Sequence, residues 1–449
     1  MNDLIDIKLD YKKMKFHVFF TLITALLLSS TSAKVYTVND HSKVVVCYWG
    51  TWANYRPSNG KFTPEDVDPS LCTHLIYSFV GLDEVSSSIK SLDTWMDLEE
   101  NYALGGFRKT TDLKLRYPHL KVTVAIGGWN EGSKKYSDMA KDPSKRRKFV
   151  RSALQFVLTH QFDGLDLDWE YLAKRQGAPE DKENFILLLQ LLYDVFHKND
   201  LLLTAAIGAT AQTMDVSYNI PMMYKYLDYV HVMCYDYHGK WDKYAGHNAP
   251  LHPRPSDTPA DQSFTLAYTF AYIMEKGAIP SKTVMGVPFY GRSFKLLIPI
   301  QNEMGAPTKQ DAFQGPYTKE DGFLGYNEIC EEEMDKDHPW TKSWEEYNMA
   351  PYMFRGDRWV SFDNERSLEF KTHFAYDQGL AGVMVWSIDT DDFRGICTGL
   401  KYPLLRTLNR ALVERELGLH GDRDSGGSFA SGSPGGILGL VMGVLAWNY

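Results

Sequence analysis

The chain has 449 residues, of which 44% are hydrophobic and 23% charged, a composition that excludes a wholly disordered protein. At about 150 residues per domain this length allows roughly three domains, although a single α/β barrel can also occupy it. The 48 Lys and Arg residues against 57 Asp and Glu give a net charge of −9, which argues against a nucleic-acid binder. Aromatic residues make up 14% of the chain, and their flat apolar faces suit a core or a sugar ring equally well.

Residues 1–33 are predicted to form a cleavable export signal. Basic residues precede the apolar run from Phe16 to Leu28, and small residues that offer a cleavage site end at Ala33. The run has 13 residues, fewer than the ~20 that a membrane-spanning helix needs. A buried core helix is the alternative, and Met14 is a second candidate for the first residue. The signal predicts a secreted, extracellular protein.

Residues 421–449 are biased in a different way: the Gly/Ser-rich linker GDRDSGGSFASGSPGG is followed by the apolar tail ILGLVMGVLAWNY. Small residues, a short spacer and an apolar tail are the pattern of a glycolipid (GPI) anchor signal, with attachment between Ser425 and Ser428. A Gly/Ser-rich tail without fixed structure is the alternative. The anchor would tether the protein to the outer cell surface, and no other contact with a membrane is expected.

The five cysteines suit an exported protein with two disulfides and one thiol left over. Cys47 and Cys72 lie close in sequence, whereas Cys330 and Cys397 flank a later segment. Cys234 lies in the apolar run YVHVMCY and is predicted to be a small buried side chain. No cysteine or histidine spacing typical of zinc is present, so we expect neither a metal nor another cofactor.

Short apolar runs rich in β-branched residues alternate with helical patterns along residues 34–420. Between two of them, Phe185, Leu188, Leu189 and Leu192 recur at the spacing of an amphipathic helix. Eight alternating strands predict a (β/α)8 TIM barrel, in which a closed parallel sheet has no edges. A doubly wound open sheet is the competing architecture, but no GxGxxG turn follows the first run. The runs are 44–48, 74–79, 121–126, 164–170, 201–207, 229–235, 283–290 and 380–387.

The seventh and eighth runs are separated by 89 residues, 291–379. This stretch contains short strand-like and turn-like segments, for example GPYTKEDGFLGYNEIC and APYMFRGDRWVSFDN. We predict a small α+β insertion here, which would build one wall of a cleft at the C-terminal face of the barrel.

The fourth run, FDGLDLDWEY, carries alternating carboxylates. Because strand side chains alternate, Asp166, Asp168 and Glu170 share one face, about 6.6 Å apart, while the apolar residues between them share the other. Asp163 has the opposite parity and is predicted to be structural. Three neighbouring carboxyl groups in a barrel interior cannot all be ionised without a large electrostatic cost, so the pKa of at least one of them should rise. A carboxylic acid with a raised pKa is what general acid catalysis needs; the alternative, a solvated acidic turn, conflicts with the apolar alternate positions.

This segment matches the DxxDxDxE signature of glycoside hydrolase family 18, which comprises chitinases and chitinase-like lectins. The resemblance continues in VVCYWGTWANYR, HLIYSFVGLD, KVTVAIGGWNEGS, MCYDYHGKWD, MGVPFYGRSF and AGVMVWSIDTDDF, so it covers about residues 44–405. Within the family, the chain looks most like animal chitinases of the arthropod type.

The resemblance implies hydrolysis of chitin or chitooligosaccharides, with endo action, retention of configuration and assistance from the substrate. Glu170 would protonate the glycosidic oxygen and later activate water. Asp168 would hold the acetamido N–H of the sugar, Tyr235 would hydrogen-bond the acetamido oxygen, and Asp166 would support Asp168.

The resemblance also implies a set of residues that line a substrate cleft, with Trp386 as the floor beneath the reacting sugar. Trp52 and, in the insertion, Glu320 are additional candidates. The set is Tyr48, Phe79, Trp129, Met233, Asp236, Trp241, Tyr290, Arg292, Met384 and Trp386.

Three departures from the family pattern stand out. Ala125 occupies a position where many relatives have a serine that would hydrogen-bond Asp166, so Asp166 should depend on Tyr48 and on a proton shared with Asp168. Leu172 replaces the proline that usually follows WEY. No Cys-rich chitin-binding module follows the barrel in this sequence, which favours soluble or surface-exposed chains as substrates.

Two other functions are compatible with this family: a sugar-binding lectin without activity and an endo-β-N-acetylglucosaminidase that trims glycans. Lectin-like relatives typically lack the acid at the Glu170 position, whereas this chain retains Glu170, Asp168 and Tyr235. The long insertion favours a deep cleft for linear chitin. We therefore expect an active chitinase, acting as a monomer, with a saccharide and no nucleic acid as its partner.

Overall fold

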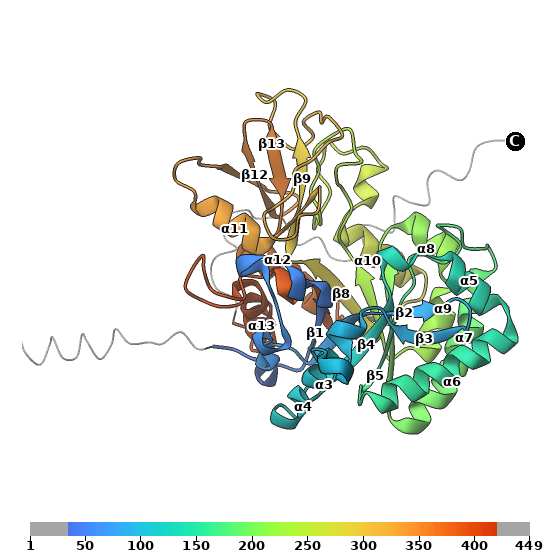
Figure 1. Cartoon of the computed structure of the whole chain (residues 1–449). Coiled ribbons are helices and arrows are strands. Elements are labelled where there is room, and N and C mark those ends of the chain that lie inside the picture. Colours follow the sequence, from blue (N-terminus) through green and yellow to red (C-terminus); the bar gives the residue numbers. More distant parts are fainter. Residues whose placement is uncertain (1–34, 420–449) are drawn as a thin grey trace, which may run out of the picture.

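Eight parallel strands close into a barrel in the computed structural model, which describes residues 35–419 (Figure 1). The sheet order is β1-β14-β8-β7-β6-β5-β4-β2, and β2 pairs back onto β1, so the sheet has no open edge there. The predicted barrel is therefore confirmed, and the alternative of a doubly wound open sheet is excluded. The strands are β1 (Val44–Gly50), β2 (His74–Asp83), β4 (Lys121–Gly127), β5 (Gly164–Asp168), β6 (Leu202–Gly208), β7 (Tyr229–Met233), β8 (Thr283–Pro288) and β14 (Gly382–Trp386).

Helices surround the barrel, and the short strand β3 (Ser88–Ser91) pairs with the end of β2 outside it. In α7 the four predicted apolar positions Phe185, Leu188, Leu189 and Leu192 are all buried, as an amphipathic helix on a sheet requires. The helices are α2 (Thr94–Asp97), α3 (Gly106–Thr111), α4 (Leu113–Arg116), α5 (Lys134–Lys141), α6 (Pro143–Thr159), α7 (Asp181–Phe196), α8 (Ala211–Ser217), α9 (Ile220–Tyr226), α10 (Leu266–Glu275), α12 (Glu365–Asp377) and α13 (Pro403–Glu416).

A second sheet stands on one side of the barrel between β8 and β14, at the top of Figure 1, and confirms the predicted α+β insertion. It is antiparallel, in the order β10-β9-β13-β12-β11, and carries α11 (Tyr326–Met334). Its first strand begins two residues after β8 ends, so barrel and insertion share one continuous chain at the site. α12 belongs to the same stretch of sequence but packs on α13, β8 and β14. The strands are β9 (Tyr290–Lys295), β10 (Phe323–Gly325), β11 (Thr341–Glu345), β12 (Ala350–Arg355) and β13 (Arg358–Ser361).

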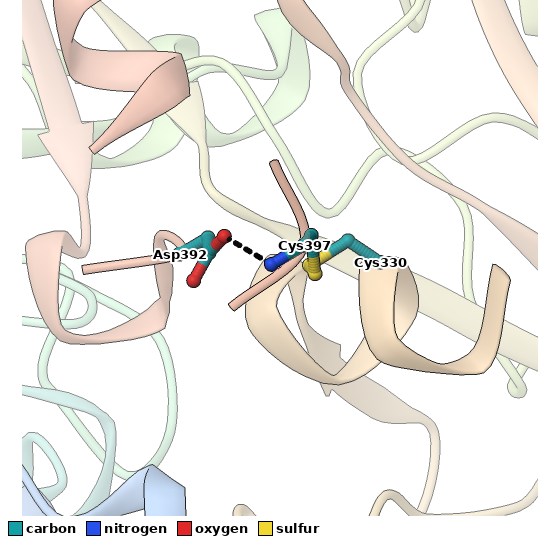
Figure 2. Close-up of side chains that lie close together, drawn as sticks. All are labelled: Cys330, Asp392 and Cys397. Atoms are coloured by element: carbon teal, nitrogen blue, oxygen red, sulfur yellow. Dashed lines mark hydrogen bonds between the residues drawn. A yellow bond between two sulfur atoms is a disulfide. The ribbon is translucent and has the colours of Figure 1, made fainter. Parts of the chain in front are cut away.

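Two disulfides form as predicted. Cys47 and Cys72 join β1 to the segment before β2, and Cys330 joins α11 of the insertion to Cys397 after β14. Figure 2 shows the second bridge, with the Cys397 amide donating a hydrogen bond of 2.9 Å to Asp392. Cys234 is a free, buried thiol, also as predicted.

The predicted export signal and the predicted linker and tail, residues 1–33 and 421–449, lie outside the described residues. Between residues 35 and 419, no helix has both the length and the apolar character needed to cross a membrane.

A fully buried ion pair lies where the insertion returns to the barrel. The Lys371 ammonium on α12 hydrogen-bonds Asp363, and both side chains are completely inaccessible to solvent. The Ser367 hydroxyl donates a further bond of 2.6 Å to Asp363. Burial lowers the pKa of Lys371, and the Asp363 carboxylate opposes that shift. Each charge is therefore tolerated inside the protein only because the other is present.

Lys371→Met should destabilise the protein by roughly 3–5 kcal/mol because it leaves the Asp363 carboxylate buried without its cation. Chemical denaturation measures this as a lower free energy of unfolding. The double variant Lys371→Met/Asp363→Leu should recover much of the loss. Lys134→Met, which breaks the exposed pair of Lys134 with Asp138 at 2.6 Å, should leave stability nearly unchanged and serves as the control. Equal stability of the two single variants would contradict the prediction.

Candidate active site

The acidic residues lie where β5 ends, at the C-terminal face of the barrel. Asp166 and Asp168 are buried, as expected for side chains on one face of the strand. The predicted strand 164–170 is two residues too long, because β5 ends at Asp168 and Glu170 lies beyond it. Glu170 is only half-buried, which places it nearer to solvent than the two aspartates.

Two glycines at the end of β4, Gly127 and Gly128, allow the chain to approach this strand end closely. The Gly128 amide donates a hydrogen bond of 2.8 Å to the Asp168 carbonyl. At Gly127, whose φ is +120°, a Cβ atom would lie 2.0 Å from the same carbonyl oxygen. Any side chain at Gly127 would therefore push β4 away from the acidic row.

Asp166 is the most strongly bound of the three acids. It accepts hydrogen bonds from the Tyr48 hydroxyl at 2.7 Å and from the Thr204 hydroxyl at 2.5 Å. His231 Nδ1 lies 3.2 Å from Asp166 and 3.0 Å from the Tyr48 oxygen. The Tyr48 contact is confirmed, whereas Thr204 and His231 are site residues that the sequence analysis missed. Each is a polar residue inside an apolar strand pattern, and that pattern is the signal that identifies them.

Asp168 has the opposite environment. Its Oδ1 atom is buried and has no hydrogen-bond partner among the described residues. Burial raises the pKa of Asp168 well above its usual value, and the charges of Glu170 and Asp166 raise it further. Asp168 can therefore gain stabilisation from a ligand that supplies an N–H group or a positive charge.

Glu170 is the acid most exposed to a ligand. Burial, together with the charge of Asp236, raises the pKa of Glu170 to about 7, while Tyr171 and Arg175 oppose the shift. Near pH 7 a substantial fraction of the molecules thus holds a proton on Glu170, which suits both donation and acceptance of a proton. The expected pKa rise in the acidic row is confirmed for Asp168 and Glu170.

A second polar group comes from the loop after β7 and from the first strand of the insertion. Asp236 accepts hydrogen bonds of 2.7 Å from the Tyr290 hydroxyl and from Arg292 Nε. Among the residues that the structure describes, the Tyr235 hydroxyl has one hydrogen-bond partner, the sulfur of Met384, a weak acceptor, at 3.8 Å. Its ring packs edge-on against Tyr290 at 5.9 Å between centroids. Tyr235 is therefore able to donate its proton to a stronger acceptor.

Aromatic side chains continue the site outward from the barrel interior. The rings of Phe79, Trp52 and Trp386 all contact one another. Phe79 is stacked on Trp386 at 5.7 Å and on Trp52 at 6.2 Å between ring centroids, and the centroids of the two tryptophans are 6.1 Å apart. Tyr48 packs against Trp386 at 5.6 Å from inside the barrel. Trp386 is half-buried and Trp52 is 44% exposed, so this aromatic cluster has faces that a flat ligand can contact.

Two further tryptophans are each accompanied by an arginine. Trp129 is 59% exposed, and the Arg175 guanidinium lies 3.7 Å from the centre of its ring. Arg292 lies 5.4 Å from the ring of Trp241, which is 50% exposed. Arg175, which also donates to the Glu170 carbonyl at 3.1 Å, is another residue that the sequence analysis missed.

The remaining predicted residues join the same neighbourhood. Met233 and Met384 pack with Tyr48, Tyr235 and Trp386 in the cluster that fills the barrel interior. Glu320 adds a favourable charge for Arg292.

Comparison with known proteins identifies one family. The family described as glycosyl hydrolases family 18 matches residues 44–391. The chain is 45% identical over 421 residues to probable chitinase 2 of Drosophila melanogaster, covering 86% of this chain and 85% of that relative. It is 42% identical to the crystal structure of Ostrinia furnacalis Group IV chitinase in complex with allosamidin, with a TM-score of 0.80, covering 83% of this chain and 99% of that one. Human YKL-39, described as a pseudo-chitinase with retained chitooligosaccharide binding properties, is 34% identical with a TM-score of 0.76, covering 82% and 99%.

Asp236→Asn should lower the pKa of Glu170 below about 7, because it removes a negative charge that disfavours ionisation of that acid. A ¹³C NMR titration of labelled glutamate carboxyls measures the change directly. Asp138→Asn, at an exposed carboxylate on α5, is the matched control and should leave the titration of Glu170 in place. An unchanged titration in Asp236→Asn would show that the charge at Asp236 has no influence on the acid.

Proposed function

The chain belongs to the glycosyl hydrolases of family 18, and on that premise we propose that it is a chitinase that cleaves β-1,4-linked N-acetylglucosamine polymers with retention of configuration. The observation that carries the proposal is the contrast within the acidic row. Glu170 can hold a proton at neutral pH, and next to it the buried Asp168 has an oxygen without a hydrogen-bond partner. A proton donor beside a group that can stabilise positive charge is what cleavage of a glycosidic bond requires.

In the first step Glu170 gives its proton to the glycosidic oxygen, and the bond from that oxygen to the anomeric carbon breaks. The carbonyl oxygen of the sugar's own acetamido group attacks the same carbon and forms an oxazolinium ion, so no carboxylate of the protein is the nucleophile. Asp168 accepts a hydrogen bond from the acetamido N–H group and stabilises the positive charge that develops on the ring. The Tyr235 hydroxyl donates to the acetamido oxygen and fixes its direction of attack.

In the second step Glu170, now a carboxylate, takes a proton from water as the water oxygen attacks the anomeric carbon and opens the oxazolinium ring. Two inversions at one carbon give overall retention. Asp166 remains bound to Tyr48, Thr204 and His231 throughout, so it supports Asp168 from below without needing to move.

The aromatic cluster of Trp52, Phe79 and Trp386 provides the binding surface in this proposal. Trp386 would lie beneath the reacting sugar, with Phe79 and Trp52 on one side of it. Trp129 and Trp241 would stack on sugars further along the chain. The substrate class is a linear chitooligosaccharide, and the allosamidin complex of the Ostrinia furnacalis enzyme is consistent with this class.

A lectin is the second candidate, because the similar human YKL-39 is described as a pseudo-chitinase with retained chitooligosaccharide binding properties. Binding alone does not require a protonated acid, whereas this chain keeps Glu170 with a raised pKa. That acid favours the enzyme.

Glu170→Gln should reduce hydrolysis of chitohexaose by about 10²- to 10⁴-fold or more, because the amide can neither donate nor take up the required proton. Chromatography of the products measures turnover and separates endo from exo cleavage, and calorimetry should still detect binding. In the parent enzyme, kcat/KM should fall as the pH rises through about 7, where Glu170 loses its proton.

Glu180→Gln, at an exposed glutamate ten residues further along the chain, is the control and should keep full activity. If Glu170→Gln turned over chitohexaose at the parent rate, Glu170 would be excluded as the acid. Binding without turnover in the parent protein would favour the lectin.

We also infer from the sequence that the protein is exported and tethered by a lipid anchor attached between Ser425 and Ser428. Phosphatidylinositol-specific phospholipase C should then release it from the surface of expressing cells, because that enzyme cuts the lipid from the protein. Activity that stays with the cells, together with detection of the apolar tail by mass spectrometry, would contradict the anchor.

A further inference from the structure

Asn248 connects the loop after β7 to two neighbouring strands of the insertion, β9 and β13, although no motif marks it. It lies in the segment Ala245–Pro250, every residue of which is buried, and Asn248 itself is completely inaccessible to solvent. A buried amide side chain needs partners for both its oxygen and its nitrogen. The identity of those partners indicates what the residue does.

All four polar groups of Asn248 are used. Its side-chain oxygen accepts from the Asp236 amide at 2.9 Å, and its side-chain nitrogen donates to the Tyr290 carbonyl at 3.1 Å. Its backbone amide donates to the Ser361 hydroxyl at 3.0 Å, and its carbonyl accepts from the Tyr237 amide at 3.1 Å. One residue thus links the loop after β7 with the start of β9 and the end of β13.

The two residues joined by the Asn248 side chain are also joined through their own side chains. The Tyr290 hydroxyl donates to the Asp236 carboxylate at 2.7 Å, so Asp236 and Tyr290 are connected at the backbone and at the side chain. Asp236 adopts a left-handed conformation with φ of +59°, which is uncommon for a residue other than glycine, although Asp adopts it more readily than most. The hydrogen bond from its amide to Asn248 stabilises that conformation.

The conformation of Asp236 matters because of its neighbours in sequence and in space. Tyr235, immediately before it, carries the hydroxyl assigned to the acetamido oxygen. The Asp236 carboxylate itself is close enough to Glu170 to influence that acid. The Asp236 side chain is 40% exposed, so its packing alone does not fix its position.

We propose that Asn248 is a positioning residue for the hydrolysis described above: it holds Asp236 and Tyr290 in one arrangement, and so keeps the Tyr235 hydroxyl and the Asp236 carboxylate aligned with the reacting sugar. The inference rests on the proposed function. Asn248 contacts neither the substrate nor the carboxyl groups of the acidic row. It acts through its hydrogen bonds to the backbone of Asp236 and Tyr290.

The test compares Asn248→Ala with Asn409→Ala in the full chain, using chitohexaose. Asn409 is the matched control, because it is equally buried and its side chain joins two backbone carbonyls, those of Leu71 and Leu405, away from the site. Both variants should lower the melting temperature. Only Asn248→Ala should lower kcat, by about 10- to 100-fold, since small displacements of reacting groups have effects of that size. Its KM should change less than its kcat.

The pH profile provides a readout that a purely structural role would not move. If Asp236 shifts away from Glu170 in Asn248→Ala, the basic limb of kcat/KM should move to lower pH, because a negative charge that favours the protonated acid has been removed. In Asn409→Ala the limb should stay in place. An Asn248→Ala enzyme with unchanged kcat and an unchanged basic limb would overturn the inference.

Asn248→Asp keeps the shape of the side chain and tests the same point if Asn248→Ala fails to fold. The new carboxylate still accepts a hydrogen bond from the Asp236 amide. It can donate to the Tyr290 carbonyl only when it is protonated. Its kcat relative to the parent should therefore rise as the pH falls, and a ratio independent of pH would contradict the inference. Failure of the parent enzyme to cleave chitohexaose would instead refute the proposed function, so the two failures are distinguishable.

Discussion

Acidic side chains next to each other in a barrel interior repel one another, and the way in which this chain arranges their partners determines the rest of the site. Asp166 receives two hydroxyl hydrogen bonds and lies beside an imidazole, whereas Asp168 has a buried oxygen without a partner. Because the stabilising groups are concentrated at the inner end of the row, the unfavourable electrostatics fall on the outer two acids. Those two acids therefore have the raised pKa values.

The insertion is part of this arrangement and not an attachment to it. Its first strand supplies Tyr290 and Arg292, which bind the Asp236 carboxylate. The insertion is in turn linked by the disulfide from Cys330 to Cys397, which follows β14. Its end at Asp363 is held by the buried pair with Lys371 on α12, a helix that packs on β8 and β14. Movement of the second sheet relative to the barrel would therefore disturb the residues next to Tyr235.

The sequence predicted the barrel, the insertion and the alternation of acids because each of these depends on a local period or on spacing. The partners of Asp166 depend on strand register, which no local pattern reveals. Asp166 lies level with Ala125 on β4 and with Thr204 on β6, so a hydroxyl on either neighbouring strand can reach it. The absence of a serine at Ala125 is visible in the sequence, but no local pattern places Thr204 beside Asp166. Asn248 was not predicted for a similar reason. A single amide in a loop belongs to no periodic pattern, and only the folded chain brings Asp236 and Tyr290 to the oxygen and the nitrogen of its side chain.

The two groups assigned to the acetamido group of the sugar share a property that the fold would normally avoid. The Tyr235 hydroxyl has only a thioether for a partner, and Asp168 Oδ1 has none among the described residues. An unsatisfied buried polar group costs roughly 1–3 kcal/mol, so the Asp168 oxygen is unfavourable in the free protein, while the Tyr235 hydroxyl has a weak partner. A sugar amide has one N–H and one carbonyl, which match an acceptor and a donor of this kind. A ligand with that pair of groups would relieve the cost at Asp168 and replace the weak partner of Tyr235 with a stronger one.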